Sequence, residues 1–230
     1  MTEDAPGKEP VVLTIDIGGS NVKLMTSDER VSRKFASGPG LTPEVMVSGA
    51  LEIARDLTFD TISIGYPGPV MHNRIAVDPH NLGPGWVDFD FERALGKPIR
   101  LVNDALMQAI GSYEGGRMLF LGLGTGLGAA MVMEHVAHPL ELAHLPYRKG
   151  MTFEDYVGDR GRKRLGNDEW RTHVFDVVGR LTDALAPEYL VIGGGNVKKL
   201  EELPPKCRRG SNASAFEGGF RLWSDHELKI

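Results

Sequence analysis

VVLTIDIGGSNVKL, residues 11–24, is the stretch that decides the fold of this chain, because an apolar run ends there at an acid and two glycines. Two further stretches have the same form: MLFLGLGTGLGAAMVM at residues 118–133 and LVIGGGN at residues 190–196. Short apolar runs bounded by glycine are typical of buried strands. Glycine lets backbone N–H groups approach a phosphate closely, so three such turns predict a protein built around a phosphate chain.

Length and composition exclude several classes of protein. The 230 residues suffice for one large domain or two smaller ones, and no apolar run is long enough to span a membrane. The net charge of −5 argues against general nucleic-acid binding. Residues 1–10 are polar and lack the apolar core of a signal peptide, so we expect a disordered tail there.

Cysteine is almost absent from the chain. Cys207 is the only one, which excludes an internal disulfide and a structural zinc site built from cysteines. A reducing, cytoplasmic compartment fits this composition.

Strand and helix patterns alternate along the chain. In the first half, strands are expected at residues 11–17, 22–26, 31–35, 61–65 and 99–102, and helices at residues 43–57, 90–95 and 105–113. In the second half, strands are expected at residues 118–123, 128–133 and 190–192, and helices at residues 153–165, 168–186, 196–203 and 216–223.

This alternation predicts an α/β protein with two lobes. The N-terminal lobe spans residues 11–104, with residues 216–230 joining it, and the C-terminal lobe spans residues 105–215. Each half opens with a strand, a glycine turn and a returning strand. Two lobes with a cleft between them explain why the glycine turns lie far apart in sequence, since they can line opposite walls of one cleft.

The first glycine turn carries the residues of a phosphate and metal site. Asp16 ends a buried strand, where its carboxylate can hold Mg²⁺ directly or through water while the amides of Gly18 and Gly19 face phosphate oxygens. Ser20 and Asn21 add donors, and Lys23 adds charge. The alternative is a hairpin in which Asp16 bonds only local backbone. The second turn favours the ligand site, because Gly124-Thr125-Gly126 between two apolar strands is unfavourable unless a ligand approaches the backbone.

Asn103-Asp104 lies between a strand and a helix. Asp is a favoured helix N-cap, which gives this pair a purely structural explanation. An N-cap needs only one of the two residues, however, and a carboxylate at a strand end can accept a proton from a substrate hydroxyl.

Several other polar residues have both a structural and a functional reading. Glu141 and His144 can face one side of a helix or tight turn and bind a polyol, or form a surface pair. Glu154 opens a helix, where an acid is favourable regardless of function. The loop His80-Asn81-Leu82-Gly83 with Trp86 can cover a sugar, or be a surface loop with a packed tryptophan. A basic stretch is either a solvated face or a track for a polyanion; it comprises Lys198, Lys199, Lys206, Arg208 and Arg209.

In order along the chain, these motifs resemble those of the ROK sugar kinases. The residues 16–23 resemble the first phosphate motif, Gly122–Gly128 the second, and Ile192–Gly195 the nucleotide-side motif. Asn103-Asp104-Ala105 resembles the catalytic motif. The sugar-side loops are matched by Gly65-Tyr66-Pro67-Gly68-Pro69-Val70 and by Asn81-Leu82 with Trp86. The matches cover nearly the whole chain.

The resemblance implies a two-lobed, actin-like ATPase fold of the hexokinase and ribonuclease H type, with a central cleft. It implies transfer of a phosphoryl group to a sugar hydroxyl with Mg²⁺, and it implies that Asp104 is the base. The sugar would be held by Gly68, Asn81, Asn103, Asp104, Glu141, His144 and Glu154. The phosphates or nucleotide would be held by Asp16, Gly18, Gly19, Ser20, Asn21, Lys23, Gly124, Thr125, Gly126, Gly193, Gly194 and Gly195.

The chain departs from the ROK pattern at two places. Ala143 stands where the glutamate–histidine motif normally has glycine, and the zinc-binding cysteine cluster is missing. A short, zinc-free chain is similar to the polyphosphate glucokinase branch, which uses polyphosphate, ATP or both. By this resemblance we expect a homodimeric, cytoplasmic enzyme that phosphorylates the 6-hydroxyl of glucose.

Three alternatives stay open at this point. The first is a sugar-binding sensor or regulator on the same scaffold; only about ten residues precede the first strand, too few for the DNA-binding segment of the family's repressors. The second is a kinase for mannose or an N-acetylated hexose, which differ from glucose at one or two contacts. The third is an actin-like phosphotransferase that acts on an acid or a vitamin.

Overall fold

The computed structural model describes residues 9–79, 81–211 and 213–230. The predicted disordered tail at residues 1–10 therefore lies mostly outside the described residues. The chain divides into two compact units. The N-terminal unit runs to Val102 and includes Gly219–His226, and the C-terminal unit comprises Asn103–Gly218 and Glu227–Ile230. We describe each unit by itself.

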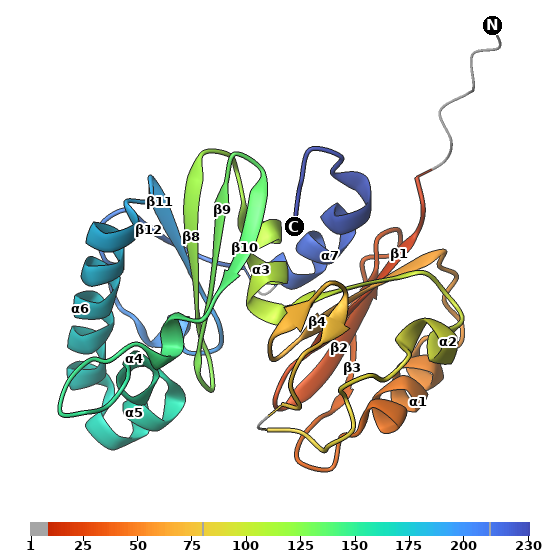
Figure 1. The fold of residues 1–230 in the computed structure, drawn as a ribbon, viewed down its shortest axis with the longest axis horizontal. Coiled ribbons are helices and arrows are strands. Elements are labelled where there is room, and N and C mark those ends of the chain that lie inside the picture. Colours follow the sequence, from red (N-terminus) through yellow and green to blue (C-terminus); the bar gives the residue numbers. More distant parts are fainter. Residues whose placement is uncertain (1–8, 80, 212) are drawn as a thin grey trace, which may run out of the picture. The chain divides into compact units, whose positions relative to one another are not determined.

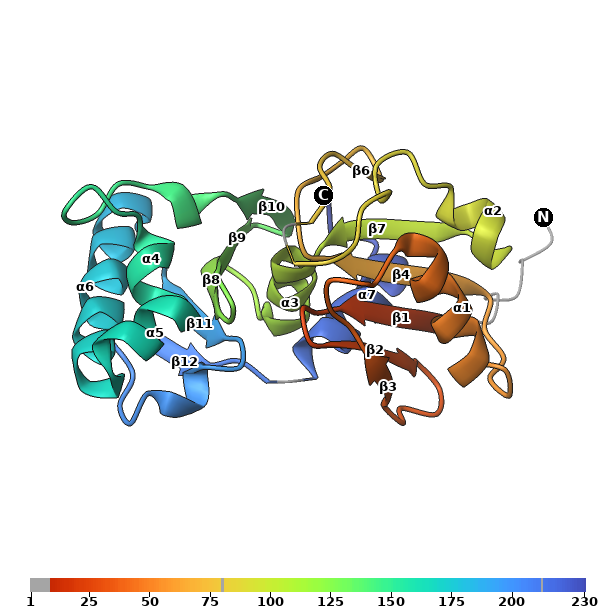
Figure 2. The same ribbon diagram turned by 90° about the horizontal axis from the view of Figure 1, so that it is seen from below.

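The N-terminal unit is built on a five-stranded sheet in the order β3-β2-β1-β4-β7, which can be followed in Figure 2. β1 pairs antiparallel with β2 and parallel with β4, so the glycine turn after β1 joins neighbouring strands. A small hairpin, β5–β6, follows β4. The strands are β1 (Val12–Ile17), β2 (Asn21–Thr26), β3 (Arg33–Ala36), β4 (Thr61–Tyr66), β5 (Val70–Met71), β6 (Arg74–Ile75) and β7 (Ile99–Asn103), and the helices are α1 (Pro43–Ile53) and α2 (Phe91–Leu95).

Side-chain alternation along β1 gives this sheet an apolar face and a face of small polar residues. Leu13, Ile15 and Ile17 belong to the buried core, together with Met46 of α1. Thr14 and Asp16 point to the other face. There Gly219 contacts Thr14 so closely that a Cβ at position 219 would collide with the threonine side chain. Residues 219–226 thus cover the polar face of the sheet.

The C-terminal unit repeats this plan with a five-stranded sheet in the order β10-β9-β8-β11-β12. Helix α3 lies on one face of this sheet, and α4, α5 and α6 lie on the other (Figure 1). The apolar core on the α6 side includes Leu119, Leu121, Trp170 and Val174. The strands are β8 (Arg117–Leu123), β9 (Leu127–Met133), β10 (Val136–Leu140), β11 (Tyr189–Gly193) and β12 (Cys207–Arg209). The helices are α3 (Asp104–Ser112), α4 (Phe153–Val157), α5 (Asp159–Leu165), α6 (Asn167–Leu185) and α7 (Ser214–Ser224), with short 3₁₀ turns η1 (Leu142–His144) and η2 (Val197–Lys199).

Three predicted helices differ from those observed. The helix expected at residues 153–165 is divided at Gly158, whose backbone is extended and where a Cβ would lie only 2.9 and 3.0 Å from the carbonyl oxygens of Glu154 and Thr125. The helix expected at 196–203 is only the short turn η2, and the helix expected at 43–57 ends at Ile53.

Two strands of the C-terminal sheet were not predicted. β10 carries His138 and Pro139, and β12 is short and carries two arginines, so neither has the apolar alternation that indicates a strand. Both lie at edges of the sheet, where polar residues are tolerated.

In the part of the chain that the structure describes, no helix has the length and apolar character needed to cross a bilayer.

Candidate active site

The first glycine turn is closed by its own backbone. The amide of Gly18 donates to the carbonyl of Asn21 at 3.0 Å, and a Cβ at Gly18 would lie only 3.0 Å from the same oxygen. Glycine is therefore the residue that fits there. Gly19 and Ser20 at the tip of the turn are exposed, so a ligand can reach them.

Asp16 is a buried carboxylate beside this turn. It lies directly across from Lys23 in the β1–β2 pair, and the Lys23 Nζ is 3.5 Å from its Oδ2. Burial raises the pKa of Asp16, and the charge of Lys23 and its hydrogen bond partly offset this effect. The alternative in which Asp16 bonds only local backbone is not what the structure shows, because its partner is the lysine of the returning strand.

The chemistry of Asp16 fits a magnesium ion. Mg²⁺ prefers hard oxygen ligands and is commonly held by one or two carboxylates together with substrate phosphates and water. Among the described residues there is no group of three or more histidine, cysteine, aspartate or glutamate side chains placed to hold a metal ion. A magnesium ion here would therefore depend on Asp16 and on the oxygens of the phosphoryl donor.

The predicted sugar-side loop is held by a carboxylate that the sequence analysis did not single out. Asp78 accepts hydrogen bonds from the amides of Gly85, Trp86 and Val87 at 3.2, 2.8 and 3.3 Å. These bonds hold the pKa of Asp78 below its usual value. An acid several residues before its partners in an irregular loop leaves no periodic signal, which is why it was missed.

Asn81 is exposed on this loop, and His80 lies outside the described residues. Trp86 is fully buried and its Nε1 donates to the carbonyl of Gly83 at 2.8 Å. Its ring packs against Tyr66 at a centroid distance of 5.5 Å. Trp86 therefore packs in the core, as expected if this segment is a surface loop with a packed tryptophan. Gly68 lies just after β4. Its amide donates to the carbonyl of Tyr66 at 2.9 Å, and there is too little space for a Cβ at position 68 beside the Tyr66 ring.

The structure assigns the helix cap to Asn103. Its Oδ1 accepts from the amide of Leu106 at 3.1 Å, which is the N-cap bond of α3. Asp104 is the first residue of α3, half-buried, with its Oδ1 bonded to the amide of Ala105 at 2.7 Å. The structural explanation of the pair is thus satisfied by Asn103. Asp104 is not needed as the cap.

The second and third glycine turns meet in the C-terminal unit. Asn196 donates from its amide to the carbonyl of Leu123 at 2.9 Å and from its Nδ2 to that of Gly124 at 3.1 Å. A Cβ at Gly194 would collide with the Leu123 carbonyl, so this contact requires glycine. The third glycine turn therefore packs against the second at Leu123 and Gly124. The amide of Asp159, at the start of α5, also bonds the carbonyls of Gly124 and Thr125.

Glu154 lies against the second glycine turn. Its Oε2 accepts from the amide of Leu127 at 3.1 Å, and a Cβ at Gly126 would collide with its carboxylate. On the same side, the Cα of Gly128 lies so close to Ala105 that a Cβ on it would be 2.8 Å from the alanine methyl. The start of α3, the second turn and Glu154 are thus neighbours.

Glu141 and His144 flank the short turn η1, and both are exposed. Ala143 between them is buried in the core of the C-terminal unit. The methyl group that departs from the ROK pattern therefore packs inward, away from the two polar residues. Their sugar-binding role stays a prediction.

The basic stretch is only partly available to a ligand. Arg208 pairs with Glu114 and bonds the carbonyl of Ser112, and Arg209 bonds the carbonyls of Val197 and Leu200. These arginines hold β12 and η2 in place. Lys198, Lys199 and Lys206 are exposed.

Known proteins are similar to this chain in sequence and in structure. No family model matches the chain. The polyphosphate glucokinase of Mycobacterium tuberculosis is 22% identical over 215 residues, which cover 83% of this chain and 80% of that protein. The inorganic polyphosphate/ATP-glucomannokinase of Arthrobacter sp. strain KM superposes with a TM-score of 0.79 at 21% identity, covering 94% of this chain and 99% of that one. A ROK family glucokinase from Streptomyces griseus, solved with glucose and AMPPNP, gives a TM-score of 0.72 at 15% identity, covering 94% and 99%.

These likenesses confirm the predicted fold class, the α/β fold of the actin-like ATPases in its ROK and hexokinase form. They also confirm the resemblance to ROK sugar kinases and, among them, to the polyphosphate glucokinases.

Proposed function

We propose that this protein is a sugar kinase that transfers a phosphoryl group to the 6-hydroxyl of glucose. The observation that carries the proposal is in the C-terminal unit, where Asn103 caps α3 and Ala105, the residue after Asp104, packs closely against Gly128 at the end of the second glycine turn. A carboxylate that is not required as a cap, one residue from a contact with a glycine turn, suits a base beside a phosphate site. The resemblance to polyphosphate and ATP-dependent sugar kinases agrees with this chemistry.

In the proposed reaction, Asp104 accepts the proton of the sugar hydroxyl as the phosphoryl group arrives. The positive end of the α3 dipole favours the carboxylate anion there. Because the transition state of phosphoryl transfer is loose, most of the acceleration comes from positioning and from stabilisation of charge. The amides of Gly19 and Gly126 would supply part of that stabilisation, because those of Gly18 and Gly124 already donate within their own turns. A magnesium ion at Asp16, when bound, would neutralise charge on the phosphates.

We propose sugar-binding groups in each unit. In the N-terminal unit these are Gly68 and Asn81, on the loops ordered by Tyr66 and Asp78. In the C-terminal unit they are Asn103, Glu141, His144 and Glu154. Glucose is favoured over mannose and N-acetylated hexoses by the resemblance alone, because these sugars differ at only one or two contacts.

The phosphoryl donor in this proposal is polyphosphate, ATP or both. Gly193–Gly195 lies on the nucleotide side, and Lys198, Lys199 and Lys206 are exposed after it. Arg208 and Arg209 bond backbone carbonyls, so three lysines of the five basic residues are left to bind a polyanion. A cytoplasmic location and a homodimer also belong to the proposal; sedimentation of the purified protein would test the homodimer.

The test of the base is Asp104→Asn. Loss of a general base lowers turnover by about 10²- to 10⁴-fold, and the amide is close enough in shape to leave sugar binding intact. We expect kcat for hexose phosphate formation to fall by that factor, with glucose affinity, measured by calorimetry, changing less than about threefold. Asp168→Asn is the matched control, because Asp168 is also an acid in the first turn of a helix and its side chain is 97% exposed. Near-normal turnover in Asp104→Asn would contradict the assignment.

The reaction itself is tested by a grid of donors against hexoses. ATP, GTP and polyphosphate are each combined with glucose, mannose and N-acetylated hexoses, and hexose phosphate is measured directly. Product with any donor separates a kinase from a sugar-binding regulator. Binding of sugar without product for any pair would favour the regulator and remove the proposed activity.

A further inference from the structure

A short hairpin links two of the proposed sugar-side residues. Residues 145–152 leave η1 immediately after His144 and return to α4, whose first turn carries Glu154. The amide of Tyr147 donates to the carbonyl of Met151 at 2.8 Å, and that of Phe153 donates to the carbonyl of Leu145 at 3.0 Å. Pro146 and Thr152 form a bridge between the two arms. His144 and Glu154 are therefore joined through a closed hairpin.

The ring of Tyr147 fixes this hairpin to helix α6. Its hydroxyl donates to Asp176 Oδ2 at 2.7 Å and lies 2.9 Å from His173 Nδ1. The ring also meets Phe153 and Tyr156 edge-on, at centroid distances of 5.4 and 4.9 Å. One side chain of the hairpin thus contacts α6 through two hydrogen bonds and α4 through two rings.

The hydrogen-bond directions follow from the donors available. The phenol of Tyr147 has one proton, which goes to the carboxylate of Asp176, so His173 Nδ1 must donate to the phenol oxygen. Burial, aided by Arg148, lowers the pKa of His173, which keeps it neutral with its proton on Nδ1 at neutral pH. His173 is buried among these groups, and Glu169 faces its other nitrogen at 3.8 Å.

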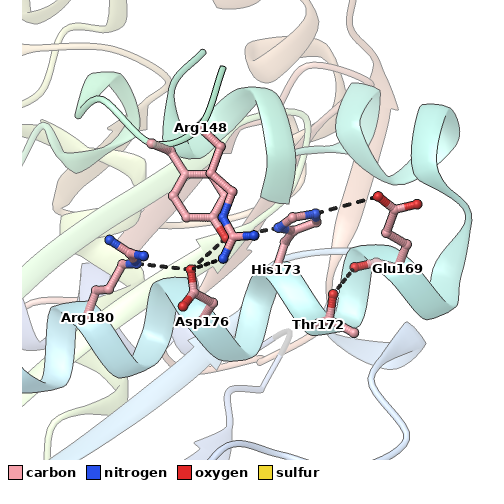
Figure 3. A network of polar contacts seen from close by, with 7 residues as sticks. Arg148, Glu169, Thr172, His173, Asp176 and Arg180 are labelled. Carbon is pink, nitrogen blue, oxygen red and sulfur yellow. Dashed lines mark hydrogen bonds and ion pairs between the residues drawn. The ribbon is translucent and has the colours of Figure 1, made fainter. Parts of the chain in front are cut away.

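Charged side chains complete the cluster, as Figure 3 shows. Asp176 lies between Arg148 of the hairpin, at 3.2 Å, and Arg180 one turn further along α6, at 3.0 Å. Tyr147 and the two arginines hold the pKa of Asp176 below its usual value, so the acceptor of the phenol proton stays ionised. A hydrogen bond to a charged acceptor is stronger than one between neutral groups.

We infer that Tyr147 is a positioning residue, which sets the places of His144 and Glu154 through its bonds to Asp176 and His173. This inference rests on the proposed sugar-kinase function. The connection to Glu154 is short, because a capping box between Thr152 and Asp155 starts α4 directly after the hairpin.

The test is Tyr147→Phe, which removes the hydroxyl and keeps the ring. Tyr156→Phe is the matched control, because it makes the same change in the same aromatic cluster, where Tyr156 contacts Tyr147, His173 and Arg164 through its ring. We expect the KM for the hexose to rise about tenfold in Tyr147→Phe, while kcat and the KM for the donor stay within about threefold. Tyr156→Phe should leave all three near the wild-type values.

A second measurement does not depend on activity. The amide of Leu127 is protected by the carboxylate of Glu154, so its hydrogen exchange reports the position of that residue. We expect exchange of the Leu127 amide to be about tenfold faster in Tyr147→Phe than in Tyr156→Phe, with the amides of β1 unchanged. Asp176→Asn keeps an acceptor for the phenol and Asp176→Ala removes it. The Leu127 amide should therefore exchange more slowly in Asp176→Asn than in Asp176→Ala.

The two measurements separate failure of this inference from failure of the proposed function. If exchange responds but the wild-type protein phosphorylates no hexose, Tyr147 positions Glu154 and the sugar-kinase proposal is wrong. If Tyr147→Phe changes neither the hexose KM nor Leu127 exchange relative to Tyr156→Phe, the positioning role is wrong. Equal increases in the KM for hexose and donor would also overturn it, because they indicate a general loss of structure.

Discussion

At the scale of single residues, Asp16 stands out as a carboxylate kept in an unfavourable place. Burial disfavours its charged form, and Lys23 compensates only in part. Such a group lowers the stability of the fold at pH values above its pKa in the unfolded chain. The loss disappears at pH values low enough to protonate it in both the folded and the unfolded protein. Retaining it is understandable if the charge serves a ligand, such as a metal ion bound to phosphate.

Asp16→Asn should therefore stabilise the protein while impairing catalysis. At pH 7.5 we expect the free energy of unfolding to rise by about 1 kcal/mol. This difference should shrink as the pH is lowered, because the raised pKa of Asp16 favours its protonation in the folded protein. Urea unfolding at pH 7.5 and at lower pH measures the change. Lys23→Met is the complementary control: it removes the compensating charge and should lower stability at pH 7.5. A destabilised Asp16→Asn protein would contradict this account.

Some residues of the candidate site can be predicted from the sequence and others cannot. The glycine turns and the pair Asn103-Asp104 were predictable, because each is a local pattern with a local cause. The sequence did not indicate which of Asn103 and Asp104 caps α3, since both can. It also did not reveal Asp78 or Tyr147, which lie in irregular segments and whose hydrogen-bond partners are seven to 29 residues away. Contacts of that kind arise only when the chain has folded.

At the scale of elements, helices α3 and α7 cross with almost no space between them. A Cβ at Gly111 would collide with the carbonyl of Ser214, and a Cβ at Gly218 would collide with that of Met107. Two glycines facing each other let the backbones approach closely. This contact holds α3, whose first residue is Asp104, against the beginning of α7.

Gly218→Ala should destabilise the protein, although alanine normally favours a helix over glycine by about 1 kcal/mol. The collision is with backbone, which cannot move aside as a flexible side chain can. Gly179→Ala, in α6, is the control, because a Cβ there meets nothing within 4 Å and should stabilise the helix. Thermal unfolding of both variants measures the contrast. Equal shifts in the two would mean that the crossing has no special role.

The elements themselves were largely predictable where a periodic pattern is long. The strands predicted at residues 11–17, 61–65, 118–123 and 128–133 agree with those observed, and so does the helix predicted at residues 168–186. The predicted helix at 153–165 was divided by Gly158 because of a contact with the second glycine turn, which lies 33 residues earlier at Thr125. β12 was missed because an edge strand of basic residues has no apolar alternation.

At the scale of the whole molecule, helix α7 belongs to both units. Its residues up to Gly218 are part of the C-terminal unit, and those from Gly219 are part of the N-terminal unit. Unfolding of either unit would therefore remove the support of this helix from the other. The fold class was predictable from the order of the motifs, whereas the sharing of one helix was not visible in them.

We predict that the two units unfold together. Trp86 and Trp223 report on the N-terminal unit, and Trp170 reports on the C-terminal unit. Two variants separate these signals: Trp170→Phe keeps the tryptophans of the N-terminal unit, and Trp86→Phe combined with Trp223→Phe keeps that of the C-terminal unit. In each variant, the denaturation curve from fluorescence should coincide with the curve from circular dichroism. Two separated transitions in either variant would show that the units are stable independently of each other.

The cover of the N-terminal sheet also has a consequence for biosynthesis. Ser63, on β4, donates its hydroxyl hydrogen to the carbonyl of Gly219, a residue 156 positions later in the chain. A ribosome adds about 5–20 residues per second, so translation must continue for roughly 8–30 seconds before that partner can emerge. Until then the nascent sheet exposes Thr14 and Ser63 on a bare face, and small hydroxyl side chains there are less adhesive than apolar ones would be.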